Sequence, residues 1–159
     1  SDISPDAAED LSTSLLRSVR RIAQAIDVRS REIARLTGLT LPQLLVLQSI
    51  RAMGEVSTSA ISRDVSMSAP TVVAVLDKLE AKGMVVRYRS SIDRRVVHAR
   101  LTEPGRQALA ASPGLLGQNF TTRFDGLSRM DRETMTAAAD RLATMMSVRS
   151  AAPEDPSST

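Results

Sequence analysis

Apolar residues recur every three or four positions near the start of the chain, and this spacing predicts an amphipathic helix from Pro5 to about Leu36. Its stripe comprises Leu11, Leu15, Val19, Ile22, Ile26 and Ile33. A helix of roughly 30 residues extends for about 45 Å, which is longer than a small domain usually needs for its own core. We therefore expect a partner chain to cover the stripe, with burial in the core of a monomer as the alternative.

A second helix is predicted between two glycines. Gly38 ends the first helix, and Thr40 with Pro42 begins the next, which continues to Gly54. Its apolar residues include Leu44, Leu45, Leu47 and Ile50. The short link from Glu55 to Thr58 that follows can hold a brief strand at Val56.

Two short helices joined by a polar turn come next. Ser57 or Thr58 can cap the first of them, and Ser68 can cap the second, which Gly83 ends. The apolar stripe of the second helix comprises Val72, Val75, Leu76 and Leu79. With the turn at residues 66–68 between them, these helices form a predicted helix-turn-helix.

A β-hairpin follows the helix-turn-helix directly. Residues 84–90 and 96–102 are β-prone, and five polar or turn-forming residues separate them. This order of elements is that of a winged helix, in which the second short helix enters the major groove of DNA. The hairpin, or wing, then reaches the flanking backbone and minor groove. The predicted fold class is mainly α with a small β-hairpin.

The C-terminal part is predicted to be helical. Thr102 caps a helix that Pro113 and Gly114 interrupt, and helix resumes over residues 116–124. A last helix begins at Ser128, which together with Asp131 resembles a capping box. Its apolar residues are Met130, Ala138, Leu142, Met145 and Met146.

The composition leaves little material for catalysis. The chain has no cysteine and a single histidine, His98, which on a wing strand is expected to lie at the surface. Without thiolates, a second histidine or a Gly-rich phosphate loop, we expect no enzyme activity, no metal site and no cofactor. No apolar run approaches the ~20 residues of a membrane span and no signal-peptide pattern opens the chain, so we expect a cytoplasmic protein without membrane contact.

Positive charge is concentrated in and beside the hairpin. The chain has 21 basic and 18 acidic residues, and nineteen of the basic residues are arginines. Seven basic residues stand between Lys82 and Arg106, against Asp93 and Glu103. Arginine matches phosphate geometry, and DNA would supply the counter-charge at the hairpin tip. The alternatives are a solvated surface and a winged helix that binds an acidic protein partner.

The segment from Leu79 to Gly105 resembles the signature of the MarR family, the multiple antibiotic resistance regulators. The matching residues are Leu79, Glu80 and Gly83 at a helix end, Arg87 on a basic strand, Asp93 and Arg95 in the wing, and Leu101, Thr102 and Gly105. The resemblance extends from about Leu11 to Val148. It implies a homodimeric winged helix and a transcriptional regulator, usually a repressor that a small molecule releases from DNA.

By this resemblance, Arg95 enters the minor groove while Asp93 holds its guanidinium, and Arg94 meets phosphate. The chemistry agrees, because a nearby carboxylate can orient an arginine toward base edges. The alternative is an ion pair that only shapes the loop. The predicted DNA-contacting residues are Ser68, Pro70, Thr71, Val73, Ala74, Lys78, Arg87, Arg89, Asp93, Arg94 and Arg95.

The second short helix of the predicted helix-turn-helix is the recognition helix, and it has few side chains that can form hydrogen bonds with base edges. Thr71, Val73 and Ala74 can touch thymine methyl groups, although Thr71 can instead serve as a local cap. Relatives often carry a polar or basic residue near Ala74, where this sequence departs. We expect shape and phosphate contacts to supply much of the affinity for DNA.

The resemblance also implies how the chain is divided. Residues 6–37 and 103–148 form dimerisation helices, and 38–102 form the DNA-binding lobe. Residues 1–5 are expected to be a flexible N-terminus, and the composition of residues 149–159 predicts a disordered tail. The expected dimer interface comprises Leu11, Leu15, Val19, Ile22, Leu142 and Met145. A small aromatic or anionic effector is expected near Ile26, Arg29, Leu44 and Leu47. The expected partners are a pseudo-palindromic double-stranded DNA operator and a second copy of the chain.

Overall fold

The computed structural model describes residues 5–147, with side chains from residue 10 onward. The chain divides into two compact units, one ending at Gly117 and the other beginning at Gln118, and each is described by itself. The predicted disordered tail over residues 149–159 lies outside the described residues, as do the first four residues of the predicted flexible N-terminus.

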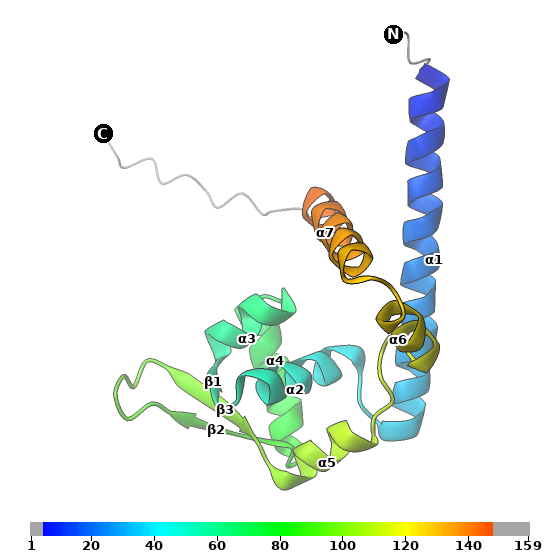
Figure 1. Ribbon diagram of the computed structural model, residues 1–159. Helices are drawn as coiled ribbons and strands as arrows, with labels where there is room; N and C mark the ends of the chain where they lie inside the picture. Colours follow the sequence, from blue (N-terminus) through cyan, green and yellow to red (C-terminus); the bar gives the residue numbers. More distant parts are fainter. Residues whose placement is uncertain (1–4, 148–159) are drawn as a thin grey trace, which may run out of the picture. The chain divides into compact units, whose positions relative to one another are not determined.

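The first unit contains five helices and three strands among its described residues. They are α1 (Pro5–Thr37), α2 (Leu41–Met53), β1 (Val56–Ser57), α3 (Thr58–Val65), α4 (Ala69–Ala81), β2 (Val85–Arg89), β3 (Val97–Leu101) and α5 (Glu103–Ala111). The second unit contains α6 (Gln118–Asp125) and α7 (Arg129–Met146). The predicted fold class, mainly α with a small hairpin, is confirmed (Figure 1).

The helices of the first unit begin where the capping residues predict. The side-chain hydroxyls of Thr40, Ser57, Ser68 and Thr102 each accept a hydrogen bond from the amide three residues further on. Thr40 forms a complete capping box with Gln43. In the second unit, Ser128 caps α7, but no reciprocal bond from Asp131 accompanies it in the described residues.

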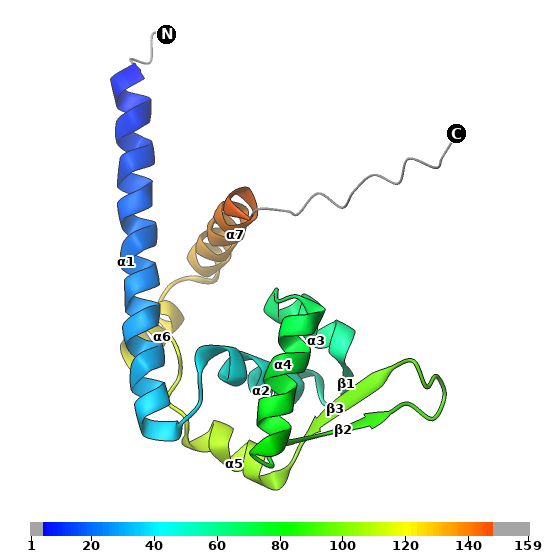
Figure 2. The same ribbon diagram turned by 180° about the vertical axis from the view of Figure 1, so that it is seen from behind.

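The three strands form one antiparallel sheet in the order β1-β3-β2. Val56 of β1 lies opposite Ala99 of the central strand β3, so the predicted short strand at Val56 is confirmed. Strands β2 and β3 pair along their whole length, from Val85 opposite Leu101 to Arg89 opposite Val97. The hairpin projects beyond the helices of the lobe in both views (Figures 1 and 2).

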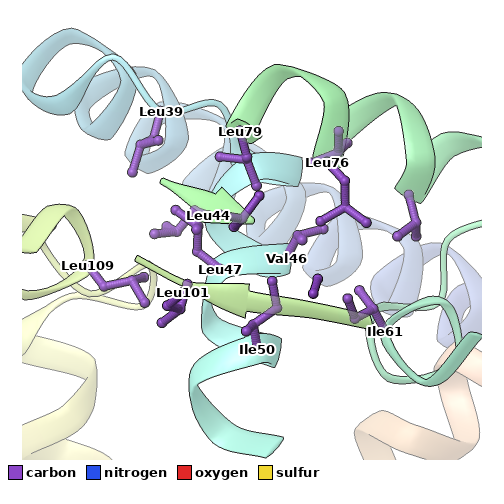
Figure 3. Close-up of a cluster of buried hydrophobic side chains, with 14 of the residues drawn as sticks. Leu39, Leu44, Val46, Leu47, Ile50, Ile61, Leu76, Leu79, Leu101 and Leu109 are labelled. Atoms are coloured by element: carbon purple, nitrogen blue, oxygen red, sulfur yellow. The ribbon is translucent and has the colours of Figure 1, made fainter. Parts of the chain in front are cut away.

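The core of the first unit is aliphatic and is centred on α2. Figure 3 shows Leu44 and Leu47 of α2 between the side chains of α4 and strand β3. The fully buried side chains are Ile33, Leu39, Leu44, Val46, Leu47, Ile50, Ile61, Val72, Leu76, Leu79 and Val85. Four of these eleven side chains belong to α2, more than to any other helix or strand, and burying each contributes roughly 1.5–3 kcal/mol. Helix α2 is therefore the main packing surface of the lobe.

Helix α5 belongs to the lobe by its packing, although the sequence grouped it with the dimerisation helices. Leu109 is buried in the same core as α2. The Thr102 hydroxyl donates to the Gly83 carbonyl at 2.6 Å, and the Thr102 amide donates to the Met84 carbonyl at 3.1 Å. A Cβ on Gly105 would stand 2.1 Å from the Met84 carbonyl oxygen. Only glycine therefore lets α5 lie this close to the start of β2.

The first half of α1 has an uncovered apolar stripe. Leu11, Leu15 and Ile22 are 73%, 49% and 60% exposed, so these side chains do not belong to the buried core of the first unit. In the second unit Met145 is 78% exposed, and Phe120 stacks on Phe124 with ring centroids 5.4 Å apart. Coverage of these surfaces by a partner chain remains a prediction.

Between residues 5 and 147, no single helix is long and apolar enough to cross a membrane. Helices α1 and α2 reach that length and composition only as a pair, bent by 81° where they meet.

Candidate nucleic-acid interface

Helix α4 has one buried and one exposed face, as predicted. Val72, Val75, Leu76 and Leu79 are buried against the lobe. Six residues predicted to contact DNA all lie exposed on or just before this helix: Ser68, Pro70, Thr71, Val73, Ala74 and Lys78. The outer face is thus exposed at these six positions, from Ser68 to Lys78.

The start of α4 is fixed by local hydrogen bonds. The Ser68 hydroxyl accepts from the Thr71 amide and lies 2.7 Å from the Thr71 hydroxyl. In the turn before it, Ser66 has a left-handed backbone (φ 54°), and the Ser62 hydroxyl donates to the Met67 carbonyl. Thr71 therefore takes part in a local cap, and each hydroxyl of the pair retains acceptor capacity for a further partner.

The wing tip is an ordered loop. The Ser90 hydroxyl accepts from the amides of Ile92 and Asp93, both at 3.2 Å. The Ser90 amide donates to the Val96 carbonyl at 2.9 Å, and the Arg89 guanidinium donates to the Arg94 carbonyl at 2.8 Å. Arg89 thus anchors the loop while its side chain stays exposed.

The predicted ion pair between Asp93 and Arg95 is present. Asp93 Oδ1 accepts from both the amide and Nε of Arg95, and Oδ2 accepts from Nη2, each at 3.1 Å. The hydrogen bonds from Arg95 hold the pKa of the Asp93 carboxyl below its ordinary value. The Arg95 side chain is nevertheless 90% exposed, so its guanidinium is both held in one orientation by Asp93 and accessible from outside. The arrangement is suited to presenting an arginine outward.

Arg87 is paired within the chain, whereas the sequence counted it with the free basic residues; its contact with phosphate stays a prediction. Its Nη2 lies 2.5 Å from Asp77 Oδ1 and 3.3 Å from Glu80 Oε1, and its side chain is only 22% exposed. Its amide also donates to Glu80 Oε2 at 3.0 Å. Asp77 and Glu80 belong to α4, so Arg87 ties the wing strand β2 to the recognition helix.

This link has a defined pH dependence. The hydrogen bond from the Arg87 side chain lowers the pKa of Glu80. The ionised Glu80 carboxylate therefore contributes to the free energy of unfolding. This contribution is fully present above the pKa of Glu80 in the unfolded state and is lost as the pH falls through its pKa in the folded state. We expect Glu80→Gln to lower the free energy of unfolding at neutral pH, with the deficit shrinking as the medium becomes acidic. Urea denaturation at a series of pH values measures the deficit.

The matched control for this prediction is Arg87→Ala. In that background Glu80→Gln should add a smaller pH-dependent loss, because the side-chain donor that lowers the pKa of Glu80 most is gone and only the Arg87 amide still donates to it. A deficit in the wild-type background that is the same at acidic and neutral pH would contradict the assigned link.

Three wing and lobe residues have environments that sequence reasoning missed. Ile92 is 97% exposed at the wing tip; the sequence feature that could have predicted this is a single isoleucine within a run of polar residues. Lys82 Nζ donates to the Gly38 carbonyl at 3.0 Å and to Gln43 Oε1 at 3.1 Å, so it links α4 to the start of α2. His98 packs edge-on against Tyr88, with ring centroids 5.6 Å apart.

The four residues expected around an effector are not equivalent. Leu44 and Leu47 are 1% and 0% exposed in the lobe core, which corrects the expectation that they line a crevice. An amphipathic helix at a crevice would keep one face accessible, whereas α2 is covered on several sides. Ile26 and Arg29 are half-buried on α1, and Arg29 Nε donates to the Gly114 carbonyl at 3.1 Å.

Comparisons with known proteins identify the family. The family model described as the MarR family matches residues 39–97, which span α2 to the start of β3. A putative transcriptional regulatory protein for the hcr operon of Thauera aromatica is 33% identical over 116 residues, covering 71% of this chain and 68% of that protein. The chain belongs to the MarR family. The expectation drawn from the segment Leu79 to Gly105 is confirmed.

Other MarR-type proteins are similar to this chain over a shorter stretch of sequence or in their fold. The HTH-type transcriptional repressor MdtR of Bacillus subtilis (strain 168) is 29% identical over 99 residues, covering 62% of this MarR-family chain and 64% of MdtR. The chain thus spans less than two thirds of that repressor's length. A solved structure on the regulation of DNA binding of Bordetella bronchiseptica BpsR by 6-hydroxynicotinic acid has a TM-score of 0.65 at 23% identity, covering 80% of this chain and 91% of BpsR. Likeness at this identity establishes the winged-helix fold.

Proposed function

We propose that this MarR-family protein is a dimeric, sequence-specific DNA-binding transcriptional regulator. We further propose that it acts as a repressor released from DNA by a small molecule. The observation that carries the proposal is the Asp93–Arg95 pair, which holds a 90% exposed guanidinium at the tip of a projecting hairpin. An arginine oriented in this way is suited to a minor groove, above all a narrow A·T-rich one.

The exposed face of α4 supports the same proposal. Val73 is 41% exposed on the outside of a helix whose other face is fully packed. An apolar residue at that place is accounted for by contact with thymine methyl groups. In the proposed complex α4 enters the major groove, Arg95 enters the adjoining minor groove, and Arg94 contacts phosphate. Arg87 acts indirectly, because its ion pairs with α4 position the wing relative to the recognition helix.

Dimerisation is proposed from the uncovered apolar residues at both ends of the described chain. The residues proposed for the interface are Leu11, Leu15, Val19, Ile22, Leu142 and Met145. Of these, Leu11, Leu15, Ile22 and Met145 are exposed in a single chain, an arrangement typical of a surface that another chain covers. Two lobes related by a two-fold axis would read a pseudo-palindromic operator.

Release by a small molecule rests on family membership and on the reported action of 6-hydroxynicotinic acid on BpsR. Of the residues expected around an effector, Ile26 and Arg29 remain candidates, because they are half-buried on α1. Leu44 and Leu47 are no longer proposed, since they fill the lobe core.

Selection of bound duplexes from a random DNA pool, repeated with small aromatic acids, tests the proposed function. We expect enrichment of an inverted repeat with A·T-rich flanks, and loss of the bound pool when the effector is present. A pool that stays random after repeated selection would contradict sequence-specific binding. It would favour the alternative in which the basic wing binds an acidic protein.

A further inference from the structure

Ile92 stands at the tip of the wing, in the loop of residues 90–96 that joins β2 to β3. Its side chain is 97% exposed, more than any other large apolar side chain that the structure describes; Met145 follows at 78%. Other strongly exposed apolar residues, such as Leu11 and Met130, lie on α1 and α7, where a partner chain is proposed. Neither that surface nor the lobe core accounts for Ile92. A single exposed apolar side chain is common on proteins, so its place in the fold matters more than its exposure.

The backbone that carries Ile92 is held on both sides. The Ile92 amide donates to the Ser90 hydroxyl at 3.2 Å, and the Val96 amide donates to the Asp93 carbonyl at 2.9 Å. Isoleucine is branched at Cβ, so its side chain has few rotamers. An apolar side chain of this kind loses little conformational entropy when another surface covers it. Ile92 is therefore preorganised for contact at the end of a hairpin that projects beyond the helices of the lobe (Figures 1 and 2).

Ile92 belongs to the same loop as the oriented guanidinium of Arg95. The two residues are three positions apart. Their Cα atoms are at most about 11 Å apart, since an extended chain advances ~3.3–3.6 Å per residue. Base pairs follow one another every ~3.4 Å along the duplex. When Arg95 lies in a minor groove, the backbone of Ile92 is therefore within about three base steps of it.

We propose that Ile92 inserts between two stacked base pairs from the minor groove and selects a flexible base step there. Isoleucine is one of the apolar side chains that serve as wedges in proteins that kink the duplex. Unstacking costs least at pyrimidine–purine steps such as TA, which kink readily. Burial of Ile92 offsets this cost, so the net gain in affinity is small, whereas the preference among base steps is large. The proposal rests on the proposed DNA binding and deepens it, because it adds a second specificity-determining residue to the wing.

Exchange of one base step separates the wedge from the arginine. Duplexes with the selected half-sites carry either a TA or an AA step at successive flank positions. Both steps keep the A·T content, and the stiffer AA step narrows the minor groove, which favours Arg95. At one flank position we expect the wild type to bind the TA duplex about fivefold or more tightly than the AA duplex, the low end of the cost of one altered base pair. Fluorescence anisotropy measures both affinities.

Three variants assign this preference to a side chain. Ile92→Ser should lose the preference for TA, and its thermal melt should match that of the wild type because the side chain is 97% exposed. Ile92→Leu should keep the preference, since leucine is also found as a wedge. Arg95→Ala should weaken binding of both duplexes and keep their ratio, because it leaves the wedge in place.

Unstacking itself is measured with 2-aminopurine in place of adenine at the preferred step, because its fluorescence rises when it leaves the stack. At saturating protein we expect a rise with the wild type and with Ile92→Leu, and none with Ile92→Ser. The wedge is wrong if the wild type binds the operator without a step preference, if Ile92→Ser keeps the preference, or if the fluorescence does not rise. The proposed function survives each of these results. Failure of the wild type to bind any selected duplex would overturn both.

Discussion

Replacing Arg95 with alanine is expected to weaken binding to duplex DNA by about 1–3 kcal/mol, or roughly 5- to 150-fold. The melting temperature should stay unchanged, because the side chain is 90% exposed and packs against no core residue. The loss follows from removing a guanidinium that Asp93 holds ready for a base edge. Fluorescence anisotropy with a labelled selected operator measures the affinity, and a thermal melt measures the fold.

Neighbouring substitutions provide the matched controls. Asp93→Ala should cause a smaller loss than Arg95→Ala, because it removes the orienting group and leaves the cation in place. Ile92→Ser should also have a smaller effect, since this 97% exposed side chain carries no charge. Unchanged affinity in Arg95→Ala would mean that the ion pair only shapes the loop.

The second large effect is expected at Gly105. Alanine there would place Cβ 2.1 Å from the carbonyl oxygen of Met84, a backbone atom that already accepts the Thr102 amide. The start of β2 and the first turn of α5 would have to separate. We expect the free energy of unfolding to fall by about 1–3 kcal/mol or more, the range for forcing extra atoms into a packed site. Urea denaturation measures this quantity.

Gly114→Ala is the matched control for Gly105. Nothing lies within 4 Å of the Cβ position at Gly114, so its stability should change by less than about 0.5 kcal/mol. Equal stability of the Gly105→Ala and Gly114→Ala variants would contradict the close approach of α5 to β2.

Local signals along the chain were sufficient to predict most of the fold. The hydroxyls of Thr40, Ser68 and Thr102 fixed three helix starts, because a cap depends only on residues three apart. The division of α4 into a buried and an exposed face followed from its periodicity. Asp93 and Arg95 are two residues apart, so their pairing was also local enough to predict.

Long-range contacts account for what sequence reasoning missed. Arg87 was counted with the free basic residues because its partners, Asp77 and Glu80, face it only once β2 lies beside α4. Leu44 and Leu47 were placed at a crevice, whereas the lobe closes over α2 from several elements at once. Periodicity identifies an apolar face, but it does not distinguish core from crevice.

Binding of a dimer to an inverted repeat tests the central claim most directly. The two half-site centres should lie about one helical turn apart, roughly 10 bp, so that both α4 helices enter the major groove on one side of the duplex. If each subunit brings Lys78, Arg89 and Arg94 to phosphate, six contacts predict a slope of about −5 for log affinity against log salt. Inserting five base pairs between the half-sites should reduce binding to the level of unrelated DNA. Full affinity for the duplex with the insertion, or a salt slope near zero, would contradict a DNA-binding dimer.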